Sequence, residues 1–136
     1  MAHRLLRAGC AVTLITDAAI GRWIEEADAV LLGADWIDRE GFINKTGSLA
    51  LSKLARFHKK PVYVIGDTLR IRRVGLPKRR LPDADPAELL TRRERGLKVE
   101  NRYFEWVPWN PSHVLVTGYR CLYPSRPGSW ALARNL

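Results

Sequence analysis

The chain has 136 residues, of which 46% are hydrophobic and 27% are charged, as is typical of one soluble globular domain. It has no apolar run long enough to span a membrane, and Cys10 and Cys121 match neither a metal-binding spacing nor a CxxC motif, so we expect free buried thiols, no metal and no cofactor. The net charge of +9 is uneven, because residues 1–55 carry six Lys and Arg against seven Asp and Glu, whereas residues 56–136 carry seventeen against seven. This excess indicates an anionic partner or a solvated basic face.

The first quarter of the chain predicts a helix, a strand and a second helix. The first helix ends at Gly9, which is suited to a helix C-terminus. The run Ala11–Thr16 (AVTLIT) is apolar, rich in β-branched residues and followed by Asp17, which favours a buried strand over a signal peptide. We therefore expect a cytoplasmic protein. Apolar residues at helical spacing then predict a helix over Ile20–Ala27.

The rest of the chain alternates strands with a helix and one long excursion. Strands alternating with helices are typical of the α/β class, so we expect a three-layer, Rossmann-like parallel sheet with flanking helices, forming a single domain over residues 1–136. The expected elements are a strand over Val30–Ala34, a helix over Thr46–His58, a strand over Val62–Ile65, a basic loop excursion at about 68–102 with one helix over Ala87–Arg95, an extended segment over Tyr103–Trp106 and a strand over His113–Thr117.

Three predicted strands end in an acidic residue, namely Asp17, Asp35 and Asp67. Parallel strands present their carboxyl ends at one edge of a sheet, where ligands bind in α/β proteins. For Asp17 and Asp67 we favour a role in beginning loops or capping helices. Asp35 is a candidate general acid or base, although on physical grounds alone a carboxylate that binds the backbone of its own loop is the favoured interpretation.

The segment Asn44–Ser48 opens the predicted central helix and carries groups suited to an anion. Lys45 brings a positive charge, Gly47 allows close approach of the backbone, and Thr46 or Ser48 caps the helix or donates a hydroxyl. The spacing matches neither a Walker loop nor GxGxxG. A helix N-cap followed by a solvated lysine remains an alternative interpretation.

A wider set of motifs lies between residues 5 and 106. They are, in chain order, Val12–Asp17, Gly33-Ala34-Asp35, Arg39-Glu40-Gly41, Asn44–Ser48, Lys60–Val64, Glu100-Asn101 and Tyr103-Phe104-Glu105. Together they resemble a superfamily that unites the regulatory subunits of the translation initiation factor two-B exchange factor with methylthioribose-1-phosphate isomerase and ribose-1,5-bisphosphate isomerase.

The resemblance implies a Rossmann-like C-terminal domain that forms a homodimer or pairs with another family subunit. It implies that Asp35 is the catalytic acid or base and that Asn44 and Lys45 contact the sugar and phosphate, with Gly47 and Ser48 beside them in the substrate-binding segment. The implied reaction is aldose–ketose isomerisation of a ribose with a phosphate on C1. The implied ligand is a phosphorylated sugar or a nucleotide.

The chain also departs from this pattern. The family's catalytic cysteine and phosphate-binding arginine lie upstream of the matching part, and Cys10 does not match that cysteine. The motif has Thr46 and Ser48 where isoleucine and threonine are usual. We therefore expect an N-terminally truncated fold that binds a sugar phosphate, or alternatively a non-catalytic regulatory or assembly subunit. Nucleic-acid binding through the basic excursion ranks last because no recognition motif accompanies it, and we expect no membrane partner.

Overall fold

The computed structural model describes residues 1–72, 81–92, 94–118 and 120–131. Within them the α-helices are α1 (Ala2–Arg7), α2 (Ile20–Trp23) and α3 (Ser48–Phe57), and the short 3-10 helices are η1 (Asp17–Ala19), η2 (Thr68–Arg70), η3 (Pro86–Glu88) and η4 (Ser129–Ala131). The strands are β1 (Val30–Gly33), β2 (Trp36–Ile37), β3 (Gly41–Lys45), β4 (Val62–Ile65), β5 (Phe104–Pro108), β6 (His113–Val116) and β7 (Cys121–Leu122).

The main sheet has the strand order β1-β4-β6-β7. Strands β1, β4 and β6 run parallel to one another, because the connection from each to the next is long enough for a crossover. Strand β7 pairs antiparallel with β6. The predicted α/β class is confirmed, with a mixed sheet. The sheet is mixed because the chain turns back directly after β6, where the Thr117 amide donates to the Arg120 carbonyl at 2.8 Å.

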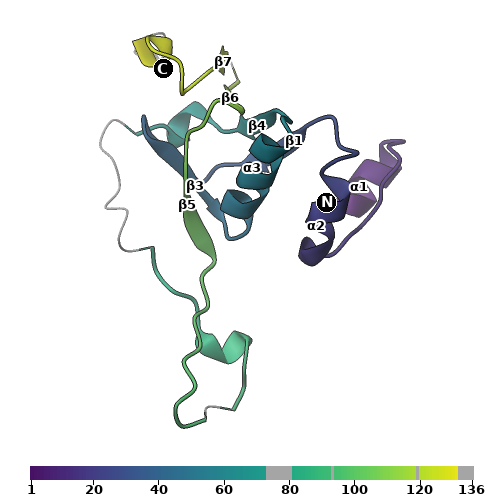
Figure 1. Cartoon of the computed structure of the whole chain (residues 1–136), viewed down its shortest axis with the longest axis vertical. Coiled ribbons are helices and arrows are strands. Elements are labelled where there is room, and N and C mark those ends of the chain that lie inside the picture. Colours follow the sequence, from purple (N-terminus) through teal and green to yellow (C-terminus); the bar gives the residue numbers. More distant parts are fainter. Residues whose placement is uncertain (73–80, 93, 119, 132–136) are drawn as a thin grey trace.

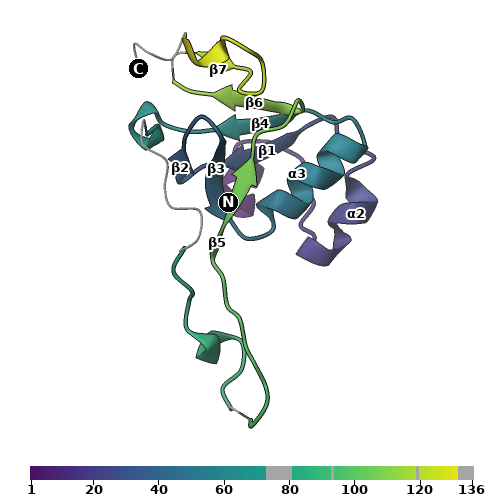
Figure 2. The same cartoon turned by 60° about the vertical axis from the view of Figure 1, so that its left-hand side comes forward.

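One face of the main sheet packs against α3 (Figure 2). Val30, Val62 and His113 lie opposite one another in neighbouring strands, and all three are buried. From α3, Ser52 and Ala55 are buried on the facing side, and the Ser52 hydroxyl contacts the His113 ring at 2.7 Å. The central helix that the sequence predicts is therefore confirmed as the element that covers this face.

A second sheet follows β1, in the stretch between the predicted strand over Val30–Ala34 and the predicted helix over Thr46–His58, where the sequence predicts no strand. Strands β2 and β3 form a hairpin, and β5 extends it into an antiparallel sheet of order β2-β3-β5. At the hairpin turn, Asp38 Oδ1 accepts hydrogen bonds from the amides of Glu40 at 2.7 Å and Gly41 at 3.1 Å. This side-chain turn lets the chain reverse, and Ile37 and Phe42 are then fully buried.

The predicted strand over Ala11–Thr16 is wrong. This segment is extended but belongs to no sheet, and Leu14 is 85% exposed. A strand needs a hydrogen-bonded neighbour, and among the described residues β1 pairs only with β4. Asp17 consequently begins η1 and does not end a strand. The expectation for Asp67 is confirmed, because its side chain accepts from the Leu69 amide at 2.9 Å and caps η2.

Residues 81–103, apart from residue 93, form an arm that projects from the body of the molecule (Figure 1). The helix predicted over 87–95 is wrong, since the arm holds only the single turn η3. Short helices depend on tertiary packing for stability. Here Leu89 and Leu97 remain 61% and 54% exposed, so these side chains bury too little apolar surface to support a longer helix.

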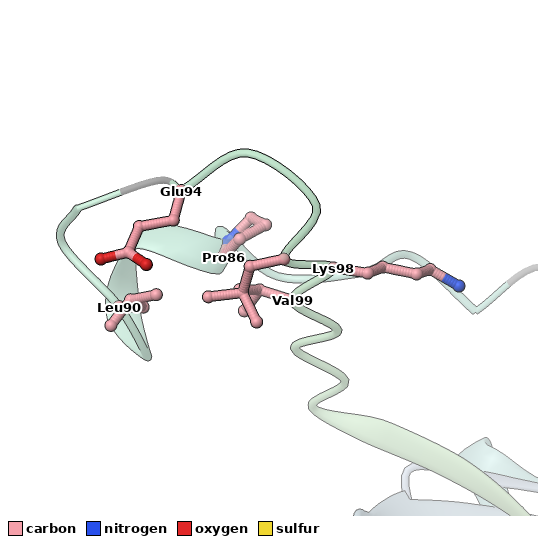
Figure 3. A pocket seen from close by; sticks show the side chains of 6 residues that line it. Pro86, Leu90, Glu94, Lys98 and Val99 are labelled. Atoms are coloured by element: carbon pink, nitrogen blue, oxygen red, sulfur yellow. The ribbon is translucent and has the colours of Figure 1, made fainter.

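The end of the arm encloses a hollow of about 320 Å³. Figure 3 shows Pro86, Leu90 and Val99 around it, while the Lys98 side chain extends away. The basic residues 73–80, which the sequence analysis assigns to the same excursion, lie outside the described residues.

Both cysteines are free and exposed, so the expectation of buried thiols is wrong. Cys10 lies in the uncovered segment after α1, and Cys121 lies on the edge strand β7, where it alternates with the buried Leu122. No helix in the described ranges is long and apolar enough to cross a membrane.

Candidate functional site

Asp35 follows β1 and is held in place from two sides. Its backbone amide donates to the Ile43 carbonyl of β3 at 2.8 Å. Arg70, at the end of η2, donates through one guanidinium nitrogen to Asp35 Oδ1 at 3.0 Å and to the Asp35 carbonyl at 3.2 Å. The Asp35 and Arg70 side chains remain 43% and 47% exposed, so this ion pair faces solvent and is accessible to a ligand.

Asn44 follows Asp35 by nine positions in the sequence, and its side chain lies over the end of β1. Its Oδ1 is 3.7 Å from the position that a Cβ would take at Gly33, and its amide nitrogen donates to the Ser48 hydroxyl at 2.9 Å. That hydroxyl donates in turn to the Lys45 carbonyl at 2.6 Å. The structure therefore brings Asn44 and Ser48 together beside the end of β1.

The start of α3 is capped by a residue that is distant in the sequence. Glu105 Oε1 accepts from the amides of Gly47 at 2.7 Å and Leu49 at 2.8 Å. Of the two alternatives for Thr46 and Ser48, capping of the helix is wrong, because Gly47 is the N-cap. Both side chains donate their hydroxyls to backbone carbonyls, Thr46 to Arg102 at 2.6 Å and Ser48 to Lys45 at 2.6 Å. Gly47 is the N-cap and has φ 104°, a backbone conformation that glycine adopts without strain.

This cap changes how an anion would meet the helix. Helix N-termini attract anions through free amides and the helix dipole. Two of the amides at the start of α3 already bind the Glu105 carboxylate. A phosphate at this helix would have to replace Glu105 or bind beside it.

Lys45 lies on the other side of β3 from Asn44, as strand alternation requires. Its ammonium nitrogen is 4.4 Å from the centre of the Tyr103 ring and 4.3 Å from that of Phe104. Cations are attracted to aromatic faces at such distances. Asn44 and Lys45, which are both expected to contact the substrate, therefore have different neighbours: Asn44 contacts Ser48, and Lys45 contacts two aromatic rings.

Two contacts of the site were not predicted from the sequence, namely Arg70 as the partner of Asp35 and Glu105 as the cap of α3. The signal for Arg70 is indirect: η2 follows β4, and β4 pairs with β1, so the segments after these parallel strands share one edge. The signal for Glu105 is the pairing of β5 with β3, which places Glu105 opposite Asn44. That register joins residues far apart in the chain, and no local pattern reveals it.

A buried serine–histidine pair lies between α3 and β6. His113 Nδ1 accepts from the Asn110 amide at 3.0 Å, so the neutral ring carries its proton on Nε2 and donates to Ser52 Oγ, 2.7 Å away. A serine nucleophile needs a histidine that accepts the hydroxyl proton. The pair therefore serves the core and does not form a nucleophilic site.

The described part of the chain holds no group of three or more His, Cys, Asp or Glu side chains that could bind a metal ion. The groups around the end of β1 that can contact a ligand are the Arg70 guanidinium, the Asp35 carboxylate and the Asn44 side-chain amide. These groups suit a phosphorylated polyol.

The sequence of residues 1–122 matches the initiation factor 2 subunit family. The chain belongs to this family. It is 31% identical over 129 residues to ribose 1,5-bisphosphate isomerase of Archaeoglobus fulgidus, covering 89% of this chain and 40% of that protein. It is 38% identical over 73 residues to translation initiation factor eIF2B subunit alpha of Dictyostelium discoideum, covering 53% of this chain and 23% of that protein.

Solved structures of family members share the fold. The structure of translation initiation factor eIF-2B subunit delta from A. fulgidus matches with a TM-score of 0.80 and 28% identity, covering 95% of this chain and 39% of that one. The structure of 5-methylthioribose 1-phosphate isomerase from Pyrococcus horikoshii matches with a TM-score of 0.78 and 25% identity, covering 96% and 38%. The chain thus spans 40% or less of the length of these relatives.

Proposed function

We propose that this chain forms the part of an initiation factor 2 subunit family protein that binds a phosphorylated pentose. The observation that carries the proposal is the 3.0 Å ion pair between Arg70 and Asp35, which directly follows β1, the strand over whose last residue, Gly33, the Asn44 side chain lies. A half-exposed guanidinium can pair with a phosphate through two parallel hydrogen bonds. The relatives named as isomerases of ribose 1,5-bisphosphate and methylthioribose 1-phosphate indicate the class of ligand.

In this proposal each side chain has a distinct task. Aldose–ketose isomerisation moves a proton between neighbouring carbon atoms, and a carboxylate at Asp35 is suited to act as the acid or base. Asn44 and Lys45, which lie on opposite sides of β3, contact the sugar and the phosphate from the two sides of the strand end, and Gly47 and Ser48 shape the start of α3 beside them. We place the protein in the cytoplasm and treat residues 1–136 as one binding domain. Because relatives are longer, catalysis by the whole protein is a separate question from binding by this chain.

The binding proposal predicts a specific effect of Arg70→Gln. Removing the guanidinium leaves the phosphate without one of its two proposed charged partners, so we expect the Kd for ribose 1,5-bisphosphate to rise by about tenfold or more, in line with a lost charge-assisted hydrogen bond. Isothermal titration calorimetry measures this directly. Arg22→Gln in α2 removes the same charge away from the site and leaves the Kd unchanged. Absence of heat with millimolar ribose 1,5-bisphosphate, methylthioribose 1-phosphate and AMP would contradict the proposal.

A second candidate function is that of a non-catalytic assembly subunit. It is favoured by the sheet face opposite α3, where Leu31 and Ile65 of neighbouring strands are 68% and 53% exposed. Exposed apolar surface of this kind is typical of protein interfaces. The relative named eIF2B subunit alpha is a subunit of a translation factor.

The assembly candidate predicts self-association. We expect light scattering on the purified chain to give about twice the monomer mass of 15.5 kDa, and Leu31→Glu to shift it toward the monomer, because the substitution places a charge on the apolar face. Leu69→Glu, at an exposed position in η2, is the matched control. A wild-type chain that stays monomeric at all concentrations tested rules out the homodimer.

A further inference from the structure

The surroundings of Lys45 connect it to the base of the arm. Its ammonium nitrogen lies 4.4 Å and 4.3 Å from the ring centres of Tyr103 and Phe104. Phe104 is the cross-strand partner of Lys45 in the β3–β5 pairing, so sheet geometry alone places that ring. Tyr103 precedes β5 and needs other contacts to hold its ring.

Two contacts hold Tyr103, one at each end of the residue. Its carbonyl accepts from the Thr46 amide at 2.9 Å, which ties the backbone to the start of the α3 segment. Its hydroxyl donates to Glu88 Oε2 of the arm. The carboxylate stabilises the protonated phenol and thereby raises the pKa of Tyr103.

Glu88 is itself fixed by a buried residue. Asn101 is only 7% exposed, and its side-chain amide nitrogen donates to Glu88 Oε2 at 3.2 Å and to the Asp85 carbonyl at 2.8 Å. The arm closes on itself at the same level, where the Ala84 amide donates to the Asn101 carbonyl at 2.8 Å. The arm is therefore held around η3 by a connected network that ends on the Tyr103 hydroxyl.

We propose that Tyr103 is a positioning residue, held by Glu88 of the arm, that sets the position of the Lys45 ammonium for an anionic ligand. A lysine has four rotatable side-chain bonds, and confining its ammonium before the ligand arrives lowers the entropy lost on binding. Tyr103 contributes the aromatic face, and Glu88 fixes the direction of that face. The statement about the ligand rests on the proposed function, whereas the statement about the position of Lys45 does not.

The position of Lys45 can be measured in the full chain without any ligand. Aromatic rings shift nearby protons upfield, so we expect the ε-methylene resonance of Lys45 in the ¹³C–¹H spectrum to lie upfield of the other lysines, with its assignment made from its loss in Lys45→Arg. Tyr103→Leu removes one ring, and the resonance moves toward the bulk. Tyr103→Phe and Glu88→Ala each keep the aromatic ring but remove the hydrogen bond that holds it. We expect these variants to move the Lys45 resonance in the same direction by a smaller amount.

The matched control is Tyr123→Phe. Tyr123 is 43% exposed, close to the 41% of Tyr103, and it also lies against a cation, with the Arg126 guanidinium carbon 4.3 Å from its ring centre. We expect this variant to leave the Lys45 resonance unchanged. In calorimetry, Tyr103→Phe should raise the Kd for ribose 1,5-bisphosphate severalfold, while Tyr123→Phe leaves it at the wild-type value.

The outcomes separate the two proposals. A Lys45 resonance at the bulk lysine position, or one that Tyr103→Phe and Glu88→Ala leave in place, overturns the positioning role. A resonance that moves while the Kd stays constant overturns its link to the ligand. If the wild-type chain binds no phosphorylated pentose, the proposed function fails, and the spectra still decide whether Tyr103 positions Lys45.

Discussion

Gly41→Ala is expected to lower the free energy of unfolding by about 3 kcal/mol, the upper part of the range for forcing an added group into a packed site. A Cβ at Gly41 would lie 2.3 Å from the Val107 carbonyl oxygen and 2.7 Å from a ring carbon of Trp106. The first of these atoms belongs to the backbone of β5, which pairs with β3 along its whole length. Relief of the clash therefore requires the two strands to separate locally.

Urea denaturation measures this effect, and Gly21→Ala in α2 is the matched control. No atom lies within 4 Å of the position that a Cβ would take at Gly21, and alanine in place of glycine in a helix is favourable by roughly 0.5–1 kcal/mol. The two variants should thus change stability in opposite directions. Equal stability of Gly41→Ala and the wild-type chain would show that β3 and β5 do not approach each other this closely.

His113 is expected to make the fold sensitive to acid. Burial lowers the pKa of His113 from 6.5 to about 4, and the side chain is fully buried in the sheet face beside α3. Between these two pH values the unfolded chain binds a proton that the folded chain does not bind. Stability is therefore complete above pH 6.5 and falls as the pH drops toward 4, by about 3 kcal/mol over that interval.

The free energy of unfolding between pH 7 and pH 4 tests this expectation. His113→Gln removes the titrating group and should flatten the dependence, although it lowers stability at pH 7 by breaking the contact with Ser52. His3→Gln, at an exposed position in α1, should keep the wild-type dependence. An unchanged slope in His113→Gln would assign the acid sensitivity to other groups.

Part of the candidate site could be predicted from the sequence, and part of it depends on how the strands pair. Asp35 and Asn44 lie close to the end of β1 as expected, because a strand end followed by a return to a helix start is visible in the sequence. Lys45 lies apart from Asn44, because β3 is a strand and neighbouring side chains alternate. The hairpin was missed because the apolar runs that flank its polar turn, Trp36-Ile37 and Phe42-Ile43, are each only two residues long and show no strand periodicity. The roles of these residues in binding and catalysis remain predictions.

The sequence by itself determined α3 and the strands β1, β4 and β6, together with the family to which the chain belongs. Their apolar periodicity and flanking residues are local properties, and local properties can be read from consecutive positions. Only the tertiary structure decided that Ala11–Thr16 stays outside the sheet, that Glu105 caps α3 and that Arg70 meets Asp35. Each of these depends on which distant segment lies alongside, and the hydrogen bonds and ion pairs involved form only when folding brings those segments together.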